Sequence, residues 1–231
     1  MTSNADPVRR TPRYQSLLAE LRSGQKTVLL DGPISTELDS RGVTMASGKA
    51  RRVAKDDPES LVQLHVDYIN AGARIITTHT FGGTRDVLGR EFEELTRGAV
   101  DCALEARRRT GTEDSVIVAG SLAYHSAKGP GRWDPTQDPE AWERDINDSV
   151  DLLSADVDVL LLEMVGGPTF TAPIIRAVQA NRMPFWVGFS AKEVEGHGLR
   201  VFDNAATPVD DALPGLIQLA IEGPEGGFKG E

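Results

Sequence analysis

The chain has 231 residues, of which 39% are hydrophobic and 26% charged, a composition typical of a folded domain rather than a disordered chain. Its formal net charge of −10 disfavours a nucleic-acid partner, because such proteins present a basic face. No apolar run approaches the roughly 20 residues of a membrane-spanning helix. The single cysteine, Cys102, excludes an intrachain disulfide, and we expect a cytoplasmic protein that does not bind membranes.

Short β-rich runs alternate with longer amphipathic stretches along the chain. Residues 1–12 are polar with scattered arginines, and we expect a loose tail there. The runs typical of buried strands are residues 27–30, 74–78, 115–119, 158–162 and 185–189. Helical spacing is found over residues 58–71, 92–109, 138–155, 168–181 and 210–222. The Gly-rich, polar segment 223–231 follows, so the predicted domain covers residues 13–222.

Two of the predicted helices begin with the same pair of residues, Asp57-Pro58 and Asp138-Pro139. An aspartate at the N-cap accepts a hydrogen bond from a free backbone N–H, and proline fits the first helical position because no N–H is needed there. Arginines 107–109 end another helix, where we expect solvated cations that complement the helix dipole.

The alternation of strands and helices predicts a parallel sheet covered by helices. We expect the α/β class of the (β/α)8 TIM-barrel type with only the first five βα units present, because a full barrel needs about 250 residues. Five units would leave both edges of the sheet unpaired. We therefore expect either a truncated chain or a homo-oligomer that covers the edges. A doubly wound five-stranded sheet is the alternative architecture.

Polar residues stand at the end of every predicted strand. In barrels and in open α/β sheets the chemistry lies at these C-terminal ends, so a shared polar site is predicted there. Aspartate and serine also favour turns, and any single member could instead cap a turn or a helix. The residues concerned are Asp31, Thr78 with His79 and Thr80, Gly120 with Ser121, Glu163, and Ser190.

Four segments carry a resemblance to a known family. LLDGPISTELDSRG, HVDYINAGARIITTHTFGGT, VAGSLA and LLLEMV follow one another within residues 28–212. In this order and spacing they resemble the LLDGGMGTEL-type opening, the TNTF-like strand end, the VAGSIGP segment and the Glu-Thr strand end of the homocysteine S-methyltransferases. The resemblance implies a (β/α)8 barrel that transfers a methyl group to the thiol of homocysteine, giving methionine, with a donor that varies across the family.

The resemblance also implies roles for single residues. Asp31 and Glu163 match the acids that hold the amino group of homocysteine, and two carboxylates suit an ammonium because they make charge-assisted hydrogen bonds. Backbone N–H groups near Gly120 and Ser121 would receive the substrate's carboxylate. Thr78 and His79 complete the predicted substrate pocket.

Several positions depart from the family's motifs. Pro33-Ile34-Ser35 replaces Gly-Met-Gly, His79 replaces an asparagine, and Met164 replaces the threonine after Glu163. The family further implies a zinc ion held by three cysteines from later strands, whereas Cys102 lies among alanines of a helix and is expected to pack as a small apolar residue. Two functions stay open: a methyltransferase of this family, or a non-catalytic remnant or amino-acid-binding module without the zinc-thiolate chemistry.

A different metal site is a further hypothesis. Asp31, His79, His125 and Glu163 follow four different strands, whose ends would converge in a barrel. Two imidazoles and two carboxylates suit a divalent metal such as zinc, manganese or iron. The alternative is a polar pocket without metal. The Pro- and Gly-rich loop 128–139 is expected to cover this pocket as a lid or to pack on the rim.

Overall fold

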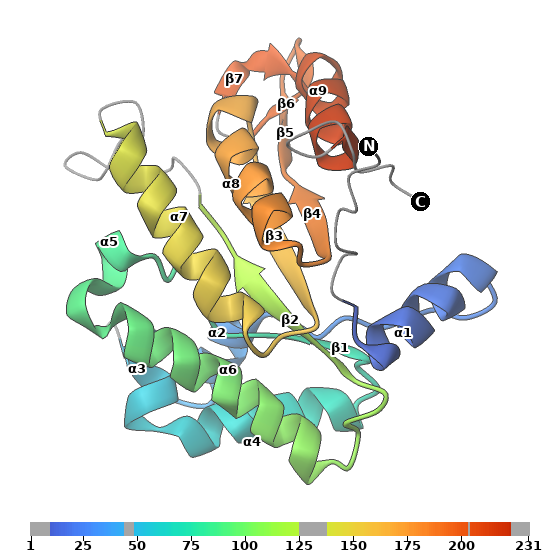
Figure 1. Ribbon diagram of the computed structural model, residues 1–231, viewed down its shortest axis with the longest axis vertical. Helices are drawn as coiled ribbons and strands as arrows, with labels where there is room; N and C mark the ends of the chain where they lie inside the picture. The colour runs from blue at the N-terminus through green and yellow to red at the C-terminus, as the bar shows by residue number, and fades with distance from the viewer. Residues whose placement is uncertain (1–9, 44–48, 125–137, 203, 223–231) are drawn as a thin grey trace, which may run out of the picture.

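A computed structural model describes residues 10–43, 49–124, 138–202 and 204–222 (Figure 1). The helices are α1 (Pro12–Ser23), α2 (Ile34–Ser40), α3 (Lys49–Asp56), α4 (Pro58–Asn70), α5 (Arg85–Leu88), the short 3-10 helix η2 (Gly89–Glu91), α6 (Phe92–Arg109), α7 (Pro139–Ser154), α8 (Pro168–Asn181) and α9 (Val209–Glu222). The strands are β1 (Ile75–Thr77), β2 (Ile117–Leu122), β3 (Val159–Val165), β4 (Phe185–Phe189), β5 (Ala191–Val194), β6 (Gly198–Val201) and β7 (Asn204–Pro208). Within these ranges, no helix is long and apolar enough to span a membrane.

The central sheet is parallel and has the order β1-β2-β3-β4. Strands that are neighbours in the sequence are therefore neighbours in space, as the barrel-type prediction requires. A doubly wound sheet would instead reverse its order at a switch point, so that alternative is wrong. In the part of the chain that the structure describes, β4 pairs only with β3, and the sheet is open at that edge.

The predicted first strand, residues 27–30, is reduced to a single parallel bridge between Leu30 and Ile75. Its backbone still runs beside β1, because the N–H of Asp31 donates to the Ile75 carbonyl and the N–H of Arg74 donates to the Leu29 carbonyl, each at 2.9 Å. Leu29 and Leu30 are each 50% exposed, so the run is apolar without being buried. The prediction that a second copy of this chain covers the open edges of the sheet stays a prediction.

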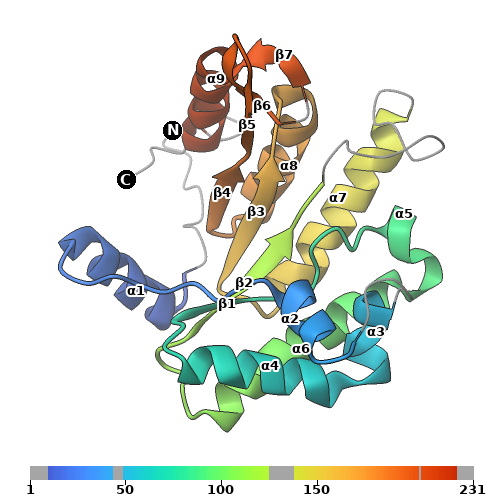
Figure 2. The same cartoon turned by 180° about the vertical axis from the view of Figure 1, so that it is seen from behind.

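Helices α4, α6, α7 and α8 lie side by side on one face of the sheet (Figures 1 and 2). Their apolar sides meet alternate strand residues, including Ile76, Val118, Leu160 and Leu162, in the main hydrophobic core. Successive side chains of a strand point to opposite faces, so the residues between these four point away from the helices.

The opposite face of the sheet packs against α1, a helix that the sequence analysis did not predict. Tyr14 and Leu17 of α1 form a second hydrophobic cluster with the inward-facing residues of β1, β2 and β3. The helix begins with Thr11 as N-cap and Pro12 at its first position. The prediction of a loose tail is therefore wrong for these two residues, and residues 1–9 lie outside the described ranges.

Asp158, directly before β3, joins α1 to the sheet. Its fully buried carboxylate accepts hydrogen bonds from Arg13 Nε and the Thr11 hydroxyl, each at 2.7 Å, from the Arg107 guanidinium at 2.9 Å, and from the Val118 N–H at 3.0 Å. A buried carboxylate needs such partners because its desolvation is costly. The prediction of a solvated Arg107 is wrong, because this side chain turns inward to Asp158.

Between β4 and α9 the chain forms a separate antiparallel sheet, β5-β6-β7, which was not predicted. Gly196 and Gly198 have φ angles of 72° and 70° in and after its first turn, a conformation that glycine adopts without strain. The predicted last helix begins at Val209 and continues through Pro214 as α9. Helices α2 and α3 also lie in a region for which the sequence analysis predicted no helix.

Candidate functional site

The carboxylate of Asp31 is fixed at the end of the first parallel segment. It accepts the backbone N–H of Thr77 at 2.7 Å and the Thr77 hydroxyl at 3.1 Å. Burial raises the pKa of Asp31 to about 7, against an ordinary 3.8. The bonds from Thr77 oppose this shift, and the negative charge of Glu163 adds to it. The structure thus brings Glu163 close enough for its charge to affect the pKa of Asp31.

Glu163 is half-buried near the C-terminal end of β3, two residues before its last residue, and accepts a hydrogen bond from the Ser121 hydroxyl. Ser121 is 1% exposed and stands at the corresponding end of β2. Asp31 and Glu163 are therefore each held by a residue of a neighbouring strand. The pair presents two carboxylates on the face of the sheet turned away from the main helices, and each is held by one residue, Asp31 by Thr77 and Glu163 by Ser121.

A network of threonines supports this arrangement. The Thr78 hydroxyl accepts the N–H of Ser121 at 3.0 Å and lies 2.7 Å from the Thr80 hydroxyl. Thr80 in turn donates to the Ser121 carbonyl at 2.6 Å. Thr78 is 1% exposed, so the structure places it behind the site as a support. The Ser121 N–H, which was predicted to receive a substrate carboxylate, already has a partner in Thr78.

Gly120 lies on the helix side of β2. A Cβ atom at this position would be 3.0 Å from Leu160 Cδ2 and 3.3 Å from Val157 Cγ2. The absence of a side chain therefore lets the core pack closely against β2, a reason for glycine that is separate from any contact with substrate.

One threonine of the site, Thr77, was not predicted from the sequence, whereas Thr80 was among the polar residues expected at the end of the second strand. The run Thr77-Thr78-His79-Thr80 could have identified Thr77 as a site residue. Alternation along a strand places Thr77 and Thr78 on opposite faces of the sheet. What the run does not reveal is that Thr77 binds Asp31, which lies 46 positions earlier.

The histidines do not assemble a metal centre in the part of the chain described. No group of three or more His, Cys, Asp or Glu residues with metal-binding geometry is found there. His125, one of the proposed ligands, lies outside the described residues, as does most of the predicted lid loop. His79 is half-buried after β1.

His65, which was not among the proposed metal ligands, is fully buried. Burial lowers its pKa to about 3, with a smaller contribution from His79, so His65 is neutral.

The residues of this chain do not fit the thiolate zinc site that the family implies. Cys102 is the chain's single cysteine, and it lies on α6, where its thiol faces the Pro58 carbonyl of α4 with Sγ and O 3.7 Å apart. Burial raises the pKa of this thiol to about 11, so it is protonated at neutral pH. It packs between helices, away from the strand ends, as the sequence predicted.

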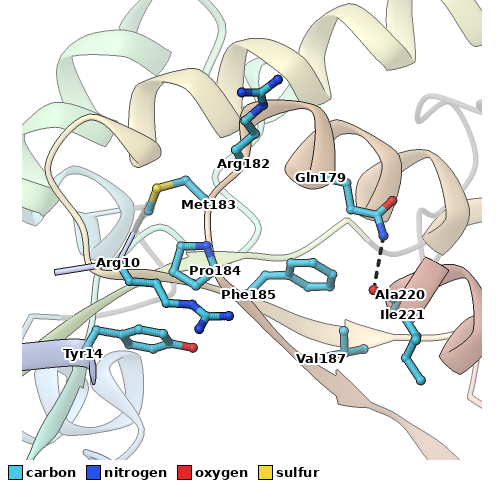
Figure 3. A pocket seen from close by; sticks show the side chains of 10 residues that line it. All are labelled: Arg10, Tyr14, Gln179, Arg182, Met183, Pro184, Phe185, Val187, Ala220 and Ile221. Carbon is cyan, nitrogen blue, oxygen red and sulfur yellow. Dashed lines mark hydrogen bonds between the residues drawn. The ribbon is translucent and has the colours of Figure 1, made fainter. Parts of the chain in front are cut away.

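A separate pocket of about 230 Å³ lies at the opposite end of the sheet, at the start of β4 (Figure 3). Arg10 and Tyr14 border it on one side, and Phe185, Val187 and Ile221 form an apolar wall. In α/β sheets of this kind the N-terminal ends of the strands serve stability rather than chemistry. The pocket is therefore distinct from the acidic site.

Comparisons with known proteins indicate the family to which the chain belongs. The family model for homocysteine S-methyltransferase matches residues 28–217. The homocysteine S-methyltransferase of Escherichia coli K12 is 28% identical over 203 residues, which cover 77% of this chain and 63% of that protein. The homocysteine S-methyltransferase YbgG of Bacillus subtilis 168 is 27% identical over 210 residues, which cover 82% of this chain and 64% of that protein.

The chain therefore spans less than two thirds of the length of these two relatives. Among solved structures, the metallated form of the homocysteine methyltransferase MmuM from E. coli superposes with a TM-score of 0.65 at 24% identity. The superposition covers 90% of this chain and 74% of MmuM, and it supports the shared α/β fold. Because the family model covers most of the chain, from the first parallel segment into α9, the protein belongs to the homocysteine S-methyltransferase family.

Proposed function

We propose that the protein binds the amino-acid end of a homocysteine-like substrate between Asp31 and Glu163 and serves the transfer of a methyl group to its thiol, giving methionine. The observation that carries the proposal is the convergence of these two carboxylates at one end of the sheet, each held by a donor from a neighbouring strand. Family membership supplies the identity of the substrate.

An ammonium group suits this site for electrostatic reasons. Two neighbouring carboxylates repel each other, and burial adds to the energy of ionising Asp31. A cation placed between them removes the repulsion and makes charge-assisted hydrogen bonds to both. Thr77 and Ser121 keep the oxygens aimed while the cation binds, so little ordering is left for the ligand to impose.

Activation of the substrate thiol is not explained by the described residues. A free thiol has an ordinary pKa of about 8.5 and is largely protonated at neutral pH. Cys102 is too far inside the helical layer, and too weakly acidic, to help hold a metal for this purpose. A second candidate function is an amino-acid-binding module that retains the pocket without the methyl transfer.

Calorimetry with homocysteine distinguishes these proposals. Wild type is expected to bind, while Asp31→Asn and Glu163→Gln each weaken binding by about tenfold or more, because each removes a charge-assisted hydrogen bond. Glu193→Gln on the exposed strand β5 is the matched control and should bind like wild type. The same samples are then supplied with S-methylmethionine or betaine as methyl donor, and methionine is measured.

Binding together with methionine formation supports the enzyme, and binding without it supports the module. Absence of homocysteine binding by wild type would overturn both. Equal binding by wild type and the two site variants would show that the ligand occupies a different place.

A further inference from the structure

A small void lies between the end of β2 and the helices that cover the sheet. The space open to the centre of a water molecule is about 10 Å³, which is room for one water. Its walls come from the segment after β1, from the end of β2 and from helices α6 and α7. The polar residues that line it are Thr80, Thr84, Thr96, Ser121, Tyr124 and Ser149.

The hydroxyl of Thr84 does not have the partner that its place in the chain would normally give it. Thr84 is the N-cap residue of α5, where a threonine hydroxyl usually accepts a hydrogen bond from the backbone of the first turn. Its side chain makes no such bond. Thr84 is 6% exposed, and its hydroxyl oxygen has no hydrogen-bond partner within the described residues. The void that Thr84 lines is therefore where its partner has to be found.

Thr96 repeats this pattern on α6. A threonine inside a helix usually bonds a backbone carbonyl three or four residues earlier. The Thr96 hydroxyl bonds neither of these carbonyls nor any other group in the part of the chain described, although Thr96 is only 4% exposed. A buried hydroxyl without a partner is unfavourable because it has lost its hydrogen bonds to water. Two such hydroxyls at one void indicate a shared partner.

Hydroxyls that already have partners complete the surroundings of this void. Thr80 donates to the Ser121 carbonyl at 2.6 Å, and the hydroxyls of Tyr124 and Ser149 lie 2.7 Å apart. A hydroxyl has two acceptor lone pairs beside its O–H, so Thr80 and Ser149 retain capacity for a further hydrogen bond. A buried water makes about three hydrogen bonds, and the hydroxyls around the void are sufficient for that number.

We propose that this void binds one buried water molecule, which bridges the hydroxyls of Thr84 and Thr96 and so ties the segment after β1 to α6. The ligand is neutral, because no charged side chain of the described residues lines the void to balance an ion. The site goes beyond the proposed function, and its test needs no substrate.

Replacement of either threonine by valine gives opposite results with and without the water. Valine has nearly the shape of threonine but carries no hydroxyl. If a water bridges the pair, Thr84→Val and Thr96→Val each remove one of its hydrogen bonds and should lower the Tm by about 2–6 °C. If no water is bound, valine replaces an unpaired buried hydroxyl by a methyl group, and the Tm should rise.

The double variant tests whether the two hydroxyls share one water. Once Thr96→Val has disrupted the bridge, the Thr84 hydroxyl has little left to lose. The Tm of the double variant should therefore fall by clearly less than the sum of the single shifts. Thr171→Val is the matched control, because Thr171 is 1% exposed and its hydroxyl donates to the Gly166 carbonyl at 3.3 Å. Its shift should add to that of Thr96→Val, since Thr171 lies on α8 and does not line the void.

NMR of the wild type observes the water directly and does not depend on the folding of any variant. With threonine methyl groups labelled, nuclear Overhauser cross peaks from water should reach the methyl groups of Thr84 and Thr96. The methyl group of Thr171, whose hydroxyl is bonded to the protein, should show none. In Thr96→Val the cross peak to Thr84 should weaken or disappear.

A wild type without water cross peaks at Thr84 and Thr96 would overturn the proposal. A rise in Tm for either valine variant would do so as well, because the hydroxyls would then be unpaired. If the shifts of Thr84→Val and Thr96→Val are simply additive, the two hydroxyls do not share a water, and the proposed bridge is wrong.

Discussion

Thr77 binds the carboxylate of Asp31 through both its backbone N–H, at 2.7 Å, and its hydroxyl, at 3.1 Å. These bonds join the short first parallel segment to β1 at the end of the sheet where Glu163 also lies. The carboxyl is held in place, yet burial keeps its pKa near neutrality. Asp31 is therefore a fixed group that changes its charge in the physiological pH range.

The first prediction concerns stability. The pKa of Asp31 is about 7 in the folded state and near 3.8 in an unfolded chain, so the folded state holds this proton more tightly. Protonated Asp31 therefore stabilises the folded state fully below about pH 4, and this contribution is lost as the pH rises to about 7. The Tm of wild type relative to Asp31→Asn should therefore fall across this window. A difference in Tm that stays constant with pH would contradict the raised pKa.

The second prediction concerns the pH dependence of ligand binding. An ammonium group requires the ionised form of Asp31, so protonation must compete with the ligand. The Kd for homocysteine should rise by up to about tenfold per pH unit below about pH 7. Calorimetry between about pH 6 and pH 8 would measure it. Asp31→Asn should bind weakly with no such slope, and a slope retained in this variant would assign the titration to another group.

The third prediction separates the residue that touches Glu163 from the one that supports it. Ser121→Ala removes the hydroxyl that donates to Glu163, and the Kd for homocysteine should rise by about threefold to tenfold. Thr78→Val leaves the buried Ser121 N–H without its acceptor and should lower the free energy of unfolding by about 1–3 kcal/mol. Urea unfolding and calorimetry on both variants check this. Ser121→Ala with unchanged affinity would show that Glu163 keeps its orientation without the hydroxyl.

The fourth prediction tests the role of Gly120. In Gly120→Ala the new methyl group would meet Leu160 Cδ2 at 3.0 Å, so the core must shift. Overpacking of this kind should lower the free energy of unfolding by about 1–3 kcal/mol, with the Kd for homocysteine little changed. If instead the Kd rises sharply while stability is retained, the backbone of Gly120 takes part in binding.

The fifth prediction addresses Cys102. Burial raises the pKa of its thiol to about 11, so the native protein should resist alkylation at about pH 8 and react only after unfolding. Cys102→Ala should retain homocysteine binding and any bound zinc that wild type contains, as measured by elemental analysis. Loss of zinc from this variant would assign the thiol a metal-binding role that its place between α4 and α6 does not indicate.

Local signals were sufficient for a large part of the architecture. Asp57 and Asp138 cap α4 and α7 as predicted, each accepting a hydrogen bond from the backbone three residues later. Such caps depend only on neighbours in the sequence, which is why they can be read from it. The alternation of apolar runs likewise predicted β1 to β4 and their parallel order.

The limits of the sequence are visible at Arg107 and at α1. An arginine at a helix end normally points to solvent, and only the approach of Asp158 from another element turns Arg107 inward. Helix α1 has a clear cap at Thr11, but the sequence contains no sign that Tyr14 and Leu17 would cover the inner face of the sheet. These interactions join positions far apart in the chain.

The sequence by itself determined which acids stand at the strand ends, Asp31 and Glu163, and the family to which their motifs belong. Only the tertiary structure decided that Thr77 and Ser121 hold them, that the Ser121 N–H is already occupied, and that Met164 has a left-handed backbone conformation. The reason is physical: strand periodicity is a local property of the chain. The orientation of a carboxylate and its pKa depend instead on burial and on groups contributed by other strands.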